Sequence, residues 1–414
     1  MLEWKYGTLP TSWELLTIGD YSNTITDYVA NGSFASLAQN VQYKEEPDVA
    51  VLIRLVDYNN NFKGDFVYID EHAYEFLSKS KLYGGEIIIS NVGANVGTVF
   101  RCPTLTLKMS LAPNSIMLRT KGIDDFYYYW FKSPVGQHAI ASIVTGSAQP
   151  KFNKTTFKKI VVPVPPIETQ RKIALCLKTI DEKIECNKSI NDNLQQQAAA
   201  IFRSWFVDCD LFGGKAPDEW ENVTLEDITA LVSRGITPKY ADDTDQIVIN
   251  QKCVRNHMID LSLARTHTPK VINEKWLRFG DLLINSTGDG TLGRAAQVWF
   301  QPKNLTVDSH VTIVRPAKEN LIFYIGLWGI LHEKEIESLH TGSTGQTELP
   351  RDRVKAMELR LPDNDTLDRF NALITPMAAA IVANQEENNQ LAALRDAILP
   401  KLMSGEIDVS AVQL

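Results

Sequence analysis

Residues 173–205 read IALCLKTIDEKIECNKSINDNLQQQAAAIFRSW, and this stretch decides the fold. Its apolar residues recur at alternating intervals of four and three, which is the heptad pattern of a helix that packs on another helix along one seam. Two asparagines interrupt the middle of that seam. The predicted seam consists of Ile173, Leu177, Ile180, Ile184, Asn187, Asn191, Leu194, Ala198, Ile201 and Trp205.

The pattern returns at residues 370–402, which read FNALITPMAAAIVANQEENNQLAALRDAILPKL. An antiparallel or a parallel pairing of the two helices would match asparagine with asparagine. Pseudo-two-fold symmetry and the long connection favour the antiparallel pairing, in which buried asparagines fix the register. Pro376 should kink the second helix or mark its first turn. The second predicted seam consists of Phe370, Ile374, Met377, Ile381, Asn384, Asn388, Leu391, Arg395, Ile398 and Leu402.

The rest of the chain also occurs twice. Pro10-x-x-Trp13-Glu14 returns as Pro217-x-x-Trp220-Glu221, the glycine-rich run 85–97 returns as 280–293, and the triplet at 145–147 returns at 341–343. Each copy has short apolar strands bounded by glycines and ends before one of the long helices. Residues 124–132 are predicted to form a helix packed on the sheet, with 321–331 as the counterpart. Two copies of one unit suggest a protein that grips something twice, and duplex DNA with two half-sites fits that geometry.

These patterns predict an α+β protein with two pseudo-symmetric α/β modules, β-rich at the part that binds, separated by an antiparallel coiled coil of two long helices. The predicted boundaries are 1–165 for the first module, 166–208 for the central helix, 209–363 for the second module and 364–414 for the C-terminal helix. A helix of about 40 residues is roughly 60 Å long. It would therefore act as a spacer between the modules.

The composition excludes several classes of protein. The chain has 42 Lys and Arg against 50 Asp and Glu, for a net charge of −8. This balance argues mildly against nucleic acid, although a basic local face can coexist with acidic helices. No apolar run is long enough to span a membrane, the N-terminus has no secretory signal, and the five cysteines form no CxxC pair. We expect a cytoplasmic protein with reduced thiols and no membrane partner.

The chain carries no recognisable catalytic motif. It has no phosphate-binding GxxxxGK[ST], no GxSxG and no Asn-Pro-Pro-aromatic run, and its histidines have no metal-ligand spacing. Gly288-x-Gly290-x-x-Gly293 matches a dinucleotide fingerprint, but a strand pattern follows it instead of a helix, so we interpret it as a turn. The sequence therefore predicts a binding and organising protein with no catalytic residue and no metal site.

Loops that recur in both modules are the candidates for DNA contact. The loop at 145–154 offers small residues, hydroxyl and amide groups and two lysines, and a twin begins at Thr341. An early loop in each module and polar residues after the buried strands are weaker candidates, with plain turns as the alternative. The candidates are Asn31, Ser33, Phe34, Ser36, Asn91, Asn95, Gly146, Ser147, Gln149, Lys151, Asn153 and Lys154, then Arg234, Thr237, Lys239, Tyr240, Thr291, Arg294, Gly342, Ser343, Thr344 and Gln346.

Four segments together resemble the specificity subunit of bacterial type I restriction–modification enzymes. They are DYVANGSFASL at 27–37, PPIE at 165–168 with Gln170, IFRSWFVD at 201–208, and LRD at 394–396 followed by LPKLMSGEI at 399–407. The resemblance covers essentially the whole chain. It implies two target recognition domains on an antiparallel coiled coil, each of which reads one half of a bipartite site in double-stranded DNA.

The resemblance also implies partners. Two modification subunits, which use S-adenosylmethionine to methylate adenine, would dock on the helices, and two restriction subunits, which use ATP and Mg²⁺, would complete the nuclease. This chain would supply recognition and spacing, with no chemistry and no cofactor of its own.

Two interpretations stay open. Phe202, Trp205 and Phe206 gather at the end of the first helix. They would dock a modification subunit or, alternatively, pack within the chain near Trp4 and Leu402. The rival function is a scaffold that does not bind DNA and presents two peptide- or protein-binding modules. The low basic content favours that rival weakly.

Overall fold

The computed structural model describes residues 1–288, 290–342 and 347–412. The chain divides into two compact units. Unit 1 comprises Met1–Ile184 and Asn389–Leu414, and unit 2 comprises Glu185–Asn388. Each unit therefore combines one module with a part of each long helix, α7 (Ile167–Phe202) and α11 (Asn364–Met403).

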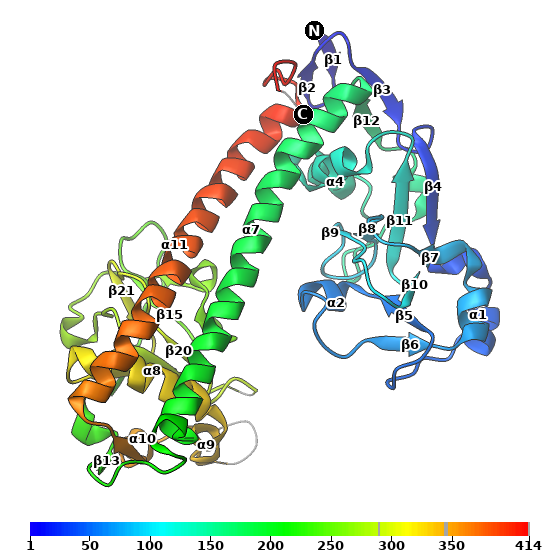
Figure 1. Cartoon of the computed structure of the whole chain (residues 1–414). Helices are drawn as coiled ribbons and strands as arrows, with labels where there is room; N and C mark the ends of the chain where they lie inside the picture. The colour runs from blue at the N-terminus through cyan, green and yellow to red at the C-terminus, as the bar shows by residue number, and fades with distance from the viewer. Residues whose placement is uncertain (289, 343–346, 413–414) are drawn as a thin grey trace. The chain divides into compact units, whose positions relative to one another are not determined.

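The module of unit 1 is built from short strands and short helices (Figure 1). Its helices are α1 (Phe34–Asn40), α2 (Leu55–Asn59), α3 (Glu71–Phe76), α4 (Asp124–Lys132), α5 (Pro134–Ala141) and α6 (Lys154–Phe157). Its strands are β1 (Leu2–Trp4), β2 (Gly7–Leu9), β3 (Glu14–Thr17), β4 (Ser22–Asp27), β5 (Ala50–Ile53), β6 (Val67–Ile69), β7 (Lys81–Leu82), β8 (Ile87–Ser90), β9 (Val99–Arg101), β10 (Lys108–Leu111), β11 (Ser115–Thr120) and β12 (Val161–Val164).

The module of unit 2 follows the same plan. Its helices are α8 (Ile322–Leu331), α9 (Glu333–Ser338) and α10 (Arg351–Lys355). Its strands are β13 (Glu221–Thr224), β14 (Thr229–Arg234), β15 (Ile247–Ile249), β16 (Val254–Arg255), β17 (Met258–Ile259), β18 (Arg265–Thr266), β19 (Leu282–Asn285), β20 (Ala295–Gln297), β21 (Leu305–Val307), β22 (Val311–Pro316) and β23 (Glu358–Leu361).

The strand order confirms the predicted repeat. The sheet β4-β11-β8-β9 of unit 1 corresponds to β14-β22-β19-β20 of unit 2, and β6-β5-β10-β7 corresponds to β18-β15-β21. In each unit the strand after the Pro-x-x-Trp motif pairs antiparallel with the strand that precedes the long helix, as β3 with β12 and as β13 with β23. The two modules are thus copies of one fold.

The predicted buried strands and helices lie at the centre of each module. Every residue of β8 and of β19 is buried. The helix predicted over 124–132 is α4, and all of Phe126–Phe131 is buried because this helix is apolar on all sides. Its counterpart α8 begins at Ile322, one residue after the predicted start.

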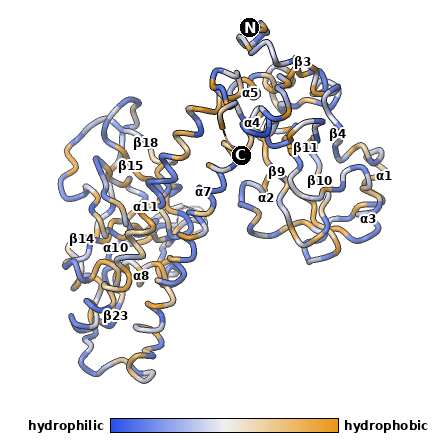
Figure 2. The backbone as a smooth tube through the Cα atoms, turned by 45° about the horizontal axis from the view of Figure 1, so that its top comes forward, coloured by the Kyte–Doolittle hydropathy of each residue, from blue (hydrophilic) through white to orange (hydrophobic). Residues whose placement is uncertain are grey.

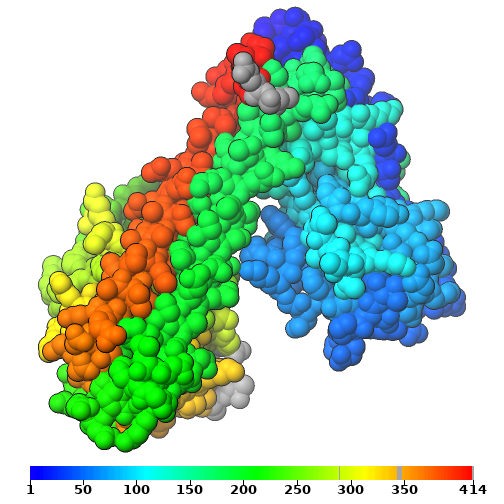
Figure 3. Space-filling model, viewed as in Figure 1, coloured from blue at the N-terminus to red at the C-terminus, as the bar shows by residue number. Residues whose placement is uncertain are grey.

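The long helices pair antiparallel, with asparagine opposite asparagine. In unit 2, Asn187 Nδ2 donates to Asn388 Oδ1 at 2.9 Å, and Asn384 Nδ2 donates to Asn191 Oδ1 at 2.8 Å. Residue numbers rise along one helix as they fall along the other, which confirms the predicted antiparallel seam and its central asparagines. Hydrophilic and hydrophobic residues alternate along both helices (Figure 2), and α11 lies against α7 (Figure 3).

The polar seam residue Arg395 is matched by an acid. In unit 1 its guanidinium donates to Asp181 Oδ1 at 2.8 Å, while Tyr129 donates its hydroxyl to Asp181 Oδ2 at 2.8 Å. Burial works against the charge of Arg395, but the hydrogen bonds to Asp181 and Asp396 outweigh it and raise the pKa of the guanidinium. The seam thus accommodates the charged side chain of Arg395 because Asp181 of α7 pairs with it.

Of the two alternatives predicted for Pro376, a kink or the first turn of the second helix, the first turn is wrong. The helix α11 begins at Asn364 and continues through Pro376 to Met403. Pro376 is exposed, and the hydroxyl of Thr375 beside it donates to the carbonyl of Asn371 at 2.7 Å. Packing of Phe370 and Ile374 into the core of unit 2 outweighs the local cost of proline.

A carboxylate residue directly precedes the central strand of each module. In unit 2, Asp281 precedes β19 and receives two hydrogen bonds of 2.7 Å from Arg315, whose remaining N–H groups bond the carbonyls of Glu274 and Trp276. In unit 1, Glu86 precedes β8 and receives a bond of 2.6 Å from Arg119. The pair in unit 2 is buried on both sides, with side chains 1 % and 8 % exposed, whereas Arg119 is 39 % exposed.

Replacing the four central asparagines with leucine should raise the melting temperature and loosen the register, because apolar seams are more stable but less specific. The register is measured as the width of the distance distribution between spin labels at the exposed positions Lys188 and Glu386. Asn193→Leu, at an exposed position of α7, is the control. A large loss of stability would contradict the shared seam.

Asp281→Leu should lower the free energy of unfolding by ~3–5 kcal/mol, because it leaves the buried charge of Arg315 without a partner. The double variant Asp281→Leu/Arg315→Met should recover most of this loss. Urea denaturation measures the free energy, and hydrogen exchange locates the change in β19 and β22. Additive losses in the double variant would show that the two side chains do not act as a pair.

Glu86 should make the stability of unit 1 depend on pH. Burial opposes ionisation of Glu86, but hydrogen bonds from the backbone of Tyr83 and from Arg119 outweigh it and lower the pKa of this carboxyl. The stabilisation is therefore complete above the ordinary carboxyl pKa and is lost as the pH falls through the folded-state value. Urea midpoints should show Glu86→Gln to be less stable near neutral pH, with a difference that shrinks in acid. A difference that stays constant would refute this.

Candidate nucleic-acid interface

Three separate candidate segments of unit 1 meet on one surface. Asn91, which follows β8, donates its side-chain amide to the carbonyl of Phe152 at 3.0 Å and accepts the Phe152 backbone N–H at 3.1 Å. Lys154 forms an ion pair of 2.8 Å with Asp27, which ends β4 and leads into the 31–36 segment. The early loop, the end of the buried strand and the 145–154 loop are therefore adjacent.

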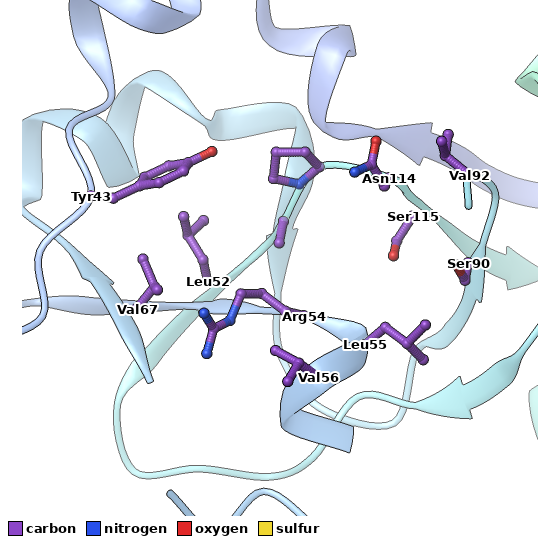
Figure 4. Close-up of a pocket in the computed structure, with 12 residues that line it drawn as sticks. Tyr43, Leu52, Arg54, Leu55, Val56, Val67, Ser90, Val92, Asn114 and Ser115 are labelled. Atoms are coloured by element: carbon purple, nitrogen blue, oxygen red, sulfur yellow. The ribbon is translucent and has the colours of Figure 1, made fainter. Parts of the chain in front are cut away.

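Two neighbouring cavities lie beside these segments. One, of about 620 Å³, is lined by residues of 27–41 together with Asn91 and Val92. The other, of about 410 Å³, is lined by the residues in Figure 4, among them Arg54. Both cavities share the lining residues Tyr43, Val92, Pro113, Asn114 and Ser115. We call the two together the unit 1 groove.

The corresponding segments of unit 2 meet in the same way. Ser286, which follows β19, accepts the backbone N–H of Leu349 at 2.9 Å, as Asn91 accepts that of Phe152 in unit 1. Arg234 ends β14, forms an ion pair of 2.6 Å with Glu348 and donates to the carbonyl of Leu349 at 2.9 Å. Ser286 also donates its backbone N–H to the carbonyl of His310.

Asp27 and Arg234 occupy equivalent positions but carry opposite charges. Asp27 pairs with Ile116 on β11, and Arg234 pairs with Thr312 on β22, so each residue ends the outer strand of the same sheet. Asp27 forms its ion pair with Lys154 of the 145–154 loop, and Arg234 forms its ion pair with Glu348 of the loop that begins at Thr341. We call these two loops the late loops. The scaffold of the surface is thus shared between the units, while its charge pattern is not.

Several predicted DNA-contact residues serve the local structure. Asn31 bonds the Tyr28 carbonyl, the Ser80 hydroxyl and the Lys79 backbone. Ser33 caps α1 by accepting from the backbone N–H of Ser36 at 3.2 Å, and Asn153 caps α6 by accepting from that of Thr156 at 2.9 Å. Such short polar side chains commonly bond nearby backbone groups.

Other predicted residues point to solvent. In unit 1 the exposed candidates are Phe34, Asn95, Gly146, Ser147, Gln149 and Lys151. Gly146 has a φ of +88°, and a Cβ there would lie 2.9 Å from the carbonyl oxygen of Gln149, so this turn requires glycine. This loop therefore has both the exposure and the tight backbone that a phosphate contact needs.

In unit 2 the exposed candidates are Thr237, Lys239, Tyr240 and Gly342. The Arg265 guanidinium lies over the Tyr240 ring, 3.6 Å from the ring centroid. Thr291 and Arg294 are half-buried and bond carbonyls of their own turn, those of Gly288 and Gly290. The glycine fingerprint is thus part of a turn, as predicted. Ser343, Thr344 and Gln346 lie outside the described residues.

Of the three predicted docking residues Phe202, Trp205 and Phe206, the first is buried and so not available to a partner. Phe202 is 1 % exposed, and all three rings pack within unit 2 against Phe370, with ring centroids 4.8–6.0 Å apart. The alternative of packing within the chain is confirmed, but not its proposed place. Trp4 and Leu402 belong to the core of unit 1. Phe202 is buried, and Trp205 and Phe206 are half-buried, because Phe370 of α11 packs against them.

Several residues of these surfaces were not predicted from the sequence. Tyr43, Arg54, Asn114 and Ser115 line the unit 1 groove. In unit 2, His310 shares a hydrogen bond of 2.6 Å with the Thr287 hydroxyl. Asn114 has a φ of +66° at the turn into β11, and a polar residue between two apolar runs is a signal for such a turn. Arg54 had no such signal, because strand pairing alone brings it to the groove.

No metal centre is found among the described residues, since no group of three His, Cys, Asp or Glu side chains is placed to hold an ion. Within the same residues no helix is long and apolar enough to cross a membrane. Burial raises the pKa of Asp308, whose carboxylate accepts the His310 backbone N–H at 2.9 Å. This carboxyl shapes the turn beside the unit 2 surface.

Comparisons with known proteins agree with this architecture. Residues 10–196 match the type I restriction modification DNA specificity domain. The chain is 26 % identical over 314 residues to the type I restriction enzyme MjaIX specificity subunit of Methanocaldococcus jannaschii, covering 69 % of this chain and 70 % of that protein. It is 22 % identical over 334 residues to the HindI specificity subunit of Haemophilus influenzae, covering 62 % and 71 %.

The fold has a solved counterpart. The crystal structure of the type I restriction–modification system S subunit from M. genitalium superposes with a TM-score of 0.57 at 14 % identity, covering 97 % of this chain and 98 % of that one. The family match covers the first module and most of α7. In its paired modules, its antiparallel helices and these sequence matches, the chain is similar to the DNA specificity subunits of type I restriction–modification systems.

Proposed function

We propose that unit 1 and unit 2 each read one half of a bipartite site in double-stranded DNA, with the surfaces on which three separate segments converge. The observation that carries this proposal is the equivalence of those surfaces. In both units the end of the central buried strand bonds the late loop, and the end of the outer strand forms an ion pair with it. A protein with two equivalent surfaces suits a target with two half-sites.

The exposed groups of each surface match the chemistry of DNA. In unit 1, Lys151 contacts phosphate, while Ser147 and Gln149 reach phosphate oxygens or base edges. In unit 2, Lys239 and Thr237 take these roles. The opposite charges at Asp27 and Arg234 give the two surfaces different potentials, so the two half-sites differ in sequence.

The helix pair supplies the distance between the half-sites and the docking sites for partners. Its central asparagines fix the register and hence the spacing. Apolar side chains are exposed on both helices, namely Leu175, Ile190, Leu373 and Leu394. We place the contacts of two modification subunits on these outer faces, since exposed apolar groups mark interaction surfaces.

The chemistry belongs to the partners in this account. The modification subunits carry S-adenosylmethionine and methylate adenine, and two restriction subunits use ATP and Mg²⁺. This chain takes part in neither step and carries no cofactor. Its net charge of −8 is compatible with DNA binding because the modification subunits enclose the DNA together with it.

Lys151→Ala should weaken DNA binding by the assembled complex and reduce the slope of log affinity against log salt by about one, since one phosphate contact is lost. The loss should be similar for specific and unrelated duplexes. Lys121→Ala is the matched control, because Lys121 is also exposed and follows the far end of β11 from the groove. Fluorescence anisotropy over a salt series measures both slopes.

Equal slopes for Lys151→Ala and wild type would remove the 145–154 loop from the interface. Binding that does not depend on salt, or a stable complex that binds no duplex, would favour the scaffold that presents two protein-binding modules.

A further inference from the structure

Phe34 is exposed where most proteins bury phenylalanine. Its side chain is 82 % exposed, more than any other large apolar side chain in the described part of the chain. It lies on the early segment of unit 1, beside the ion pair between Asp27 and Lys154. A fully exposed aromatic ring at a surface that binds DNA is available for stacking on a base.

The backbone holds Phe34 firmly. It is the first residue of α1, and Ser33 caps this helix through the hydrogen bond to Ser36. Leu37, one turn further along α1, is 3 % exposed and packs in the core with Tyr28 and Val41. The ring therefore projects from an anchored helix, and little conformational freedom is lost when it inserts into a partner.

The unit 1 groove lies next to this ring and has a polar end. Phe34, Leu37, Val41 and Tyr43 contribute apolar walls. Asn91 is also in the lining, and its Oδ1 atom is buried without a hydrogen-bond partner. A slot with apolar walls and polar groups that include Asn91 and Asn114 is complementary to the face and the amino edge of a nucleobase.

Unit 2 has no equivalent ring among its described residues. Directly after β14, Ile236 is 8 % exposed, and a Cβ on Gly235 would lie 1.9 Å from the Val307 carbonyl oxygen, so the backbone there is packed tightly against β21. Tyr240 is further along and 41 % exposed, but the Arg265 guanidinium covers one face of its ring, so the ring cannot enter a base step with both faces free. The two units therefore differ in their capacity to stack on DNA.

We propose that Phe34 inserts between adjacent bases of the half-site that unit 1 reads, and that the groove receives an amino-bearing base displaced by it. The exocyclic amino group of that base donates to Asn91 Oδ1. Apolar wedges of this kind unstack base steps and bend the duplex, which adds sequence preference through deformability. This inference rests on the proposed function and adds that only one half-site is unstacked in this way.

The test uses the complex of this chain with its modification subunit and a duplex that contains the site. The adenine analogue 2-aminopurine, whose fluorescence rises when it is unstacked, is placed singly through both half-sites. Phe34→Ala, Phe34→Leu and Tyr83→Ala are compared with wild type. Tyr83 is 71 % exposed and precedes β8, whereas the groove lies beyond its other end, so Tyr83→Ala removes an exposed ring away from the site.

We expect a fluorescence rise within one half-site that is lost in Phe34→Ala, partly kept in Phe34→Leu and unchanged in Tyr83→Ala. Phe34→Ala should also weaken specific binding about tenfold, the scale of one base–aromatic stack, with an unaltered salt slope. Any handling of the target adenine by the modification subunit is common to all variants, so it cancels in the comparison.

Equal fluorescence at every position in wild type and Phe34→Ala would overturn the inference, and so would an equal loss of affinity in Tyr83→Ala. Either result leaves salt-dependent, sequence-specific binding in place, so the proposed function would survive. If the wild-type complex binds no duplex, the inference and the proposed function fail together. Thermal melting should show unchanged stability for Phe34→Ala, because the ring makes little contact in the folded chain.

Discussion

The asparagine pairs at the centre of α7 and α11 are the constraint on which the rest of the structure depends. The amides of Asn187 and Asn191 bond those of Asn388 and Asn384 inside a seam that is otherwise mainly apolar. Sliding one helix along the other would place these amides against apolar side chains, and each unpaired buried polar group costs about 1–3 kcal/mol. The pairing therefore fixes which part of each helix joins which module.

The two modules show how one scaffold presents two different surfaces. Strand order, the buried carboxylate before the central strand and the bonds to the late loop are equivalent in both units. The residues that face outward are not: Asp27 in unit 1 stands where unit 2 has Arg234, and only unit 1 carries the exposed Phe34 after this strand. Core positions are constrained by packing, whereas loop positions are free to determine the target.

Periodic patterns along the chain are predicted well from the sequence, whereas contacts between segments that are distant in sequence are not. Both seams, the antiparallel pairing, the buried strands and α4 are confirmed, because heptads and apolar runs are local patterns that packing reinforces. The course of α11 at Pro376 is not predicted, since contacts of Phe370 and Ile374 outweigh the local preference of proline. Phe202 is taken for a docking residue because its apolar character is visible, while the ring of Phe370 that covers it is distant in sequence.

The candidate surfaces were only partly predictable for the same reason. Recurrence in both modules identifies the loops, but it does not distinguish a side chain bonded within the fold, such as Asn31, from an exposed one such as Gln149. That difference depends on hydrogen bonds formed in the folded chain. Arg54 reaches the groove through the pairing of β5 with β10, which no local pattern reveals.

The measurement that tests the central claim most directly is a methylome. The chain is expressed with its modification subunit in a host that lacks both, and methylated adenines are mapped by single-molecule sequencing. We predict a bipartite motif with two different half-sites and a fixed gap, which disappears when this chain is omitted. New methylation at a single undivided motif, or none despite a stable complex, would contradict the reading of two half-sites by two equivalent surfaces.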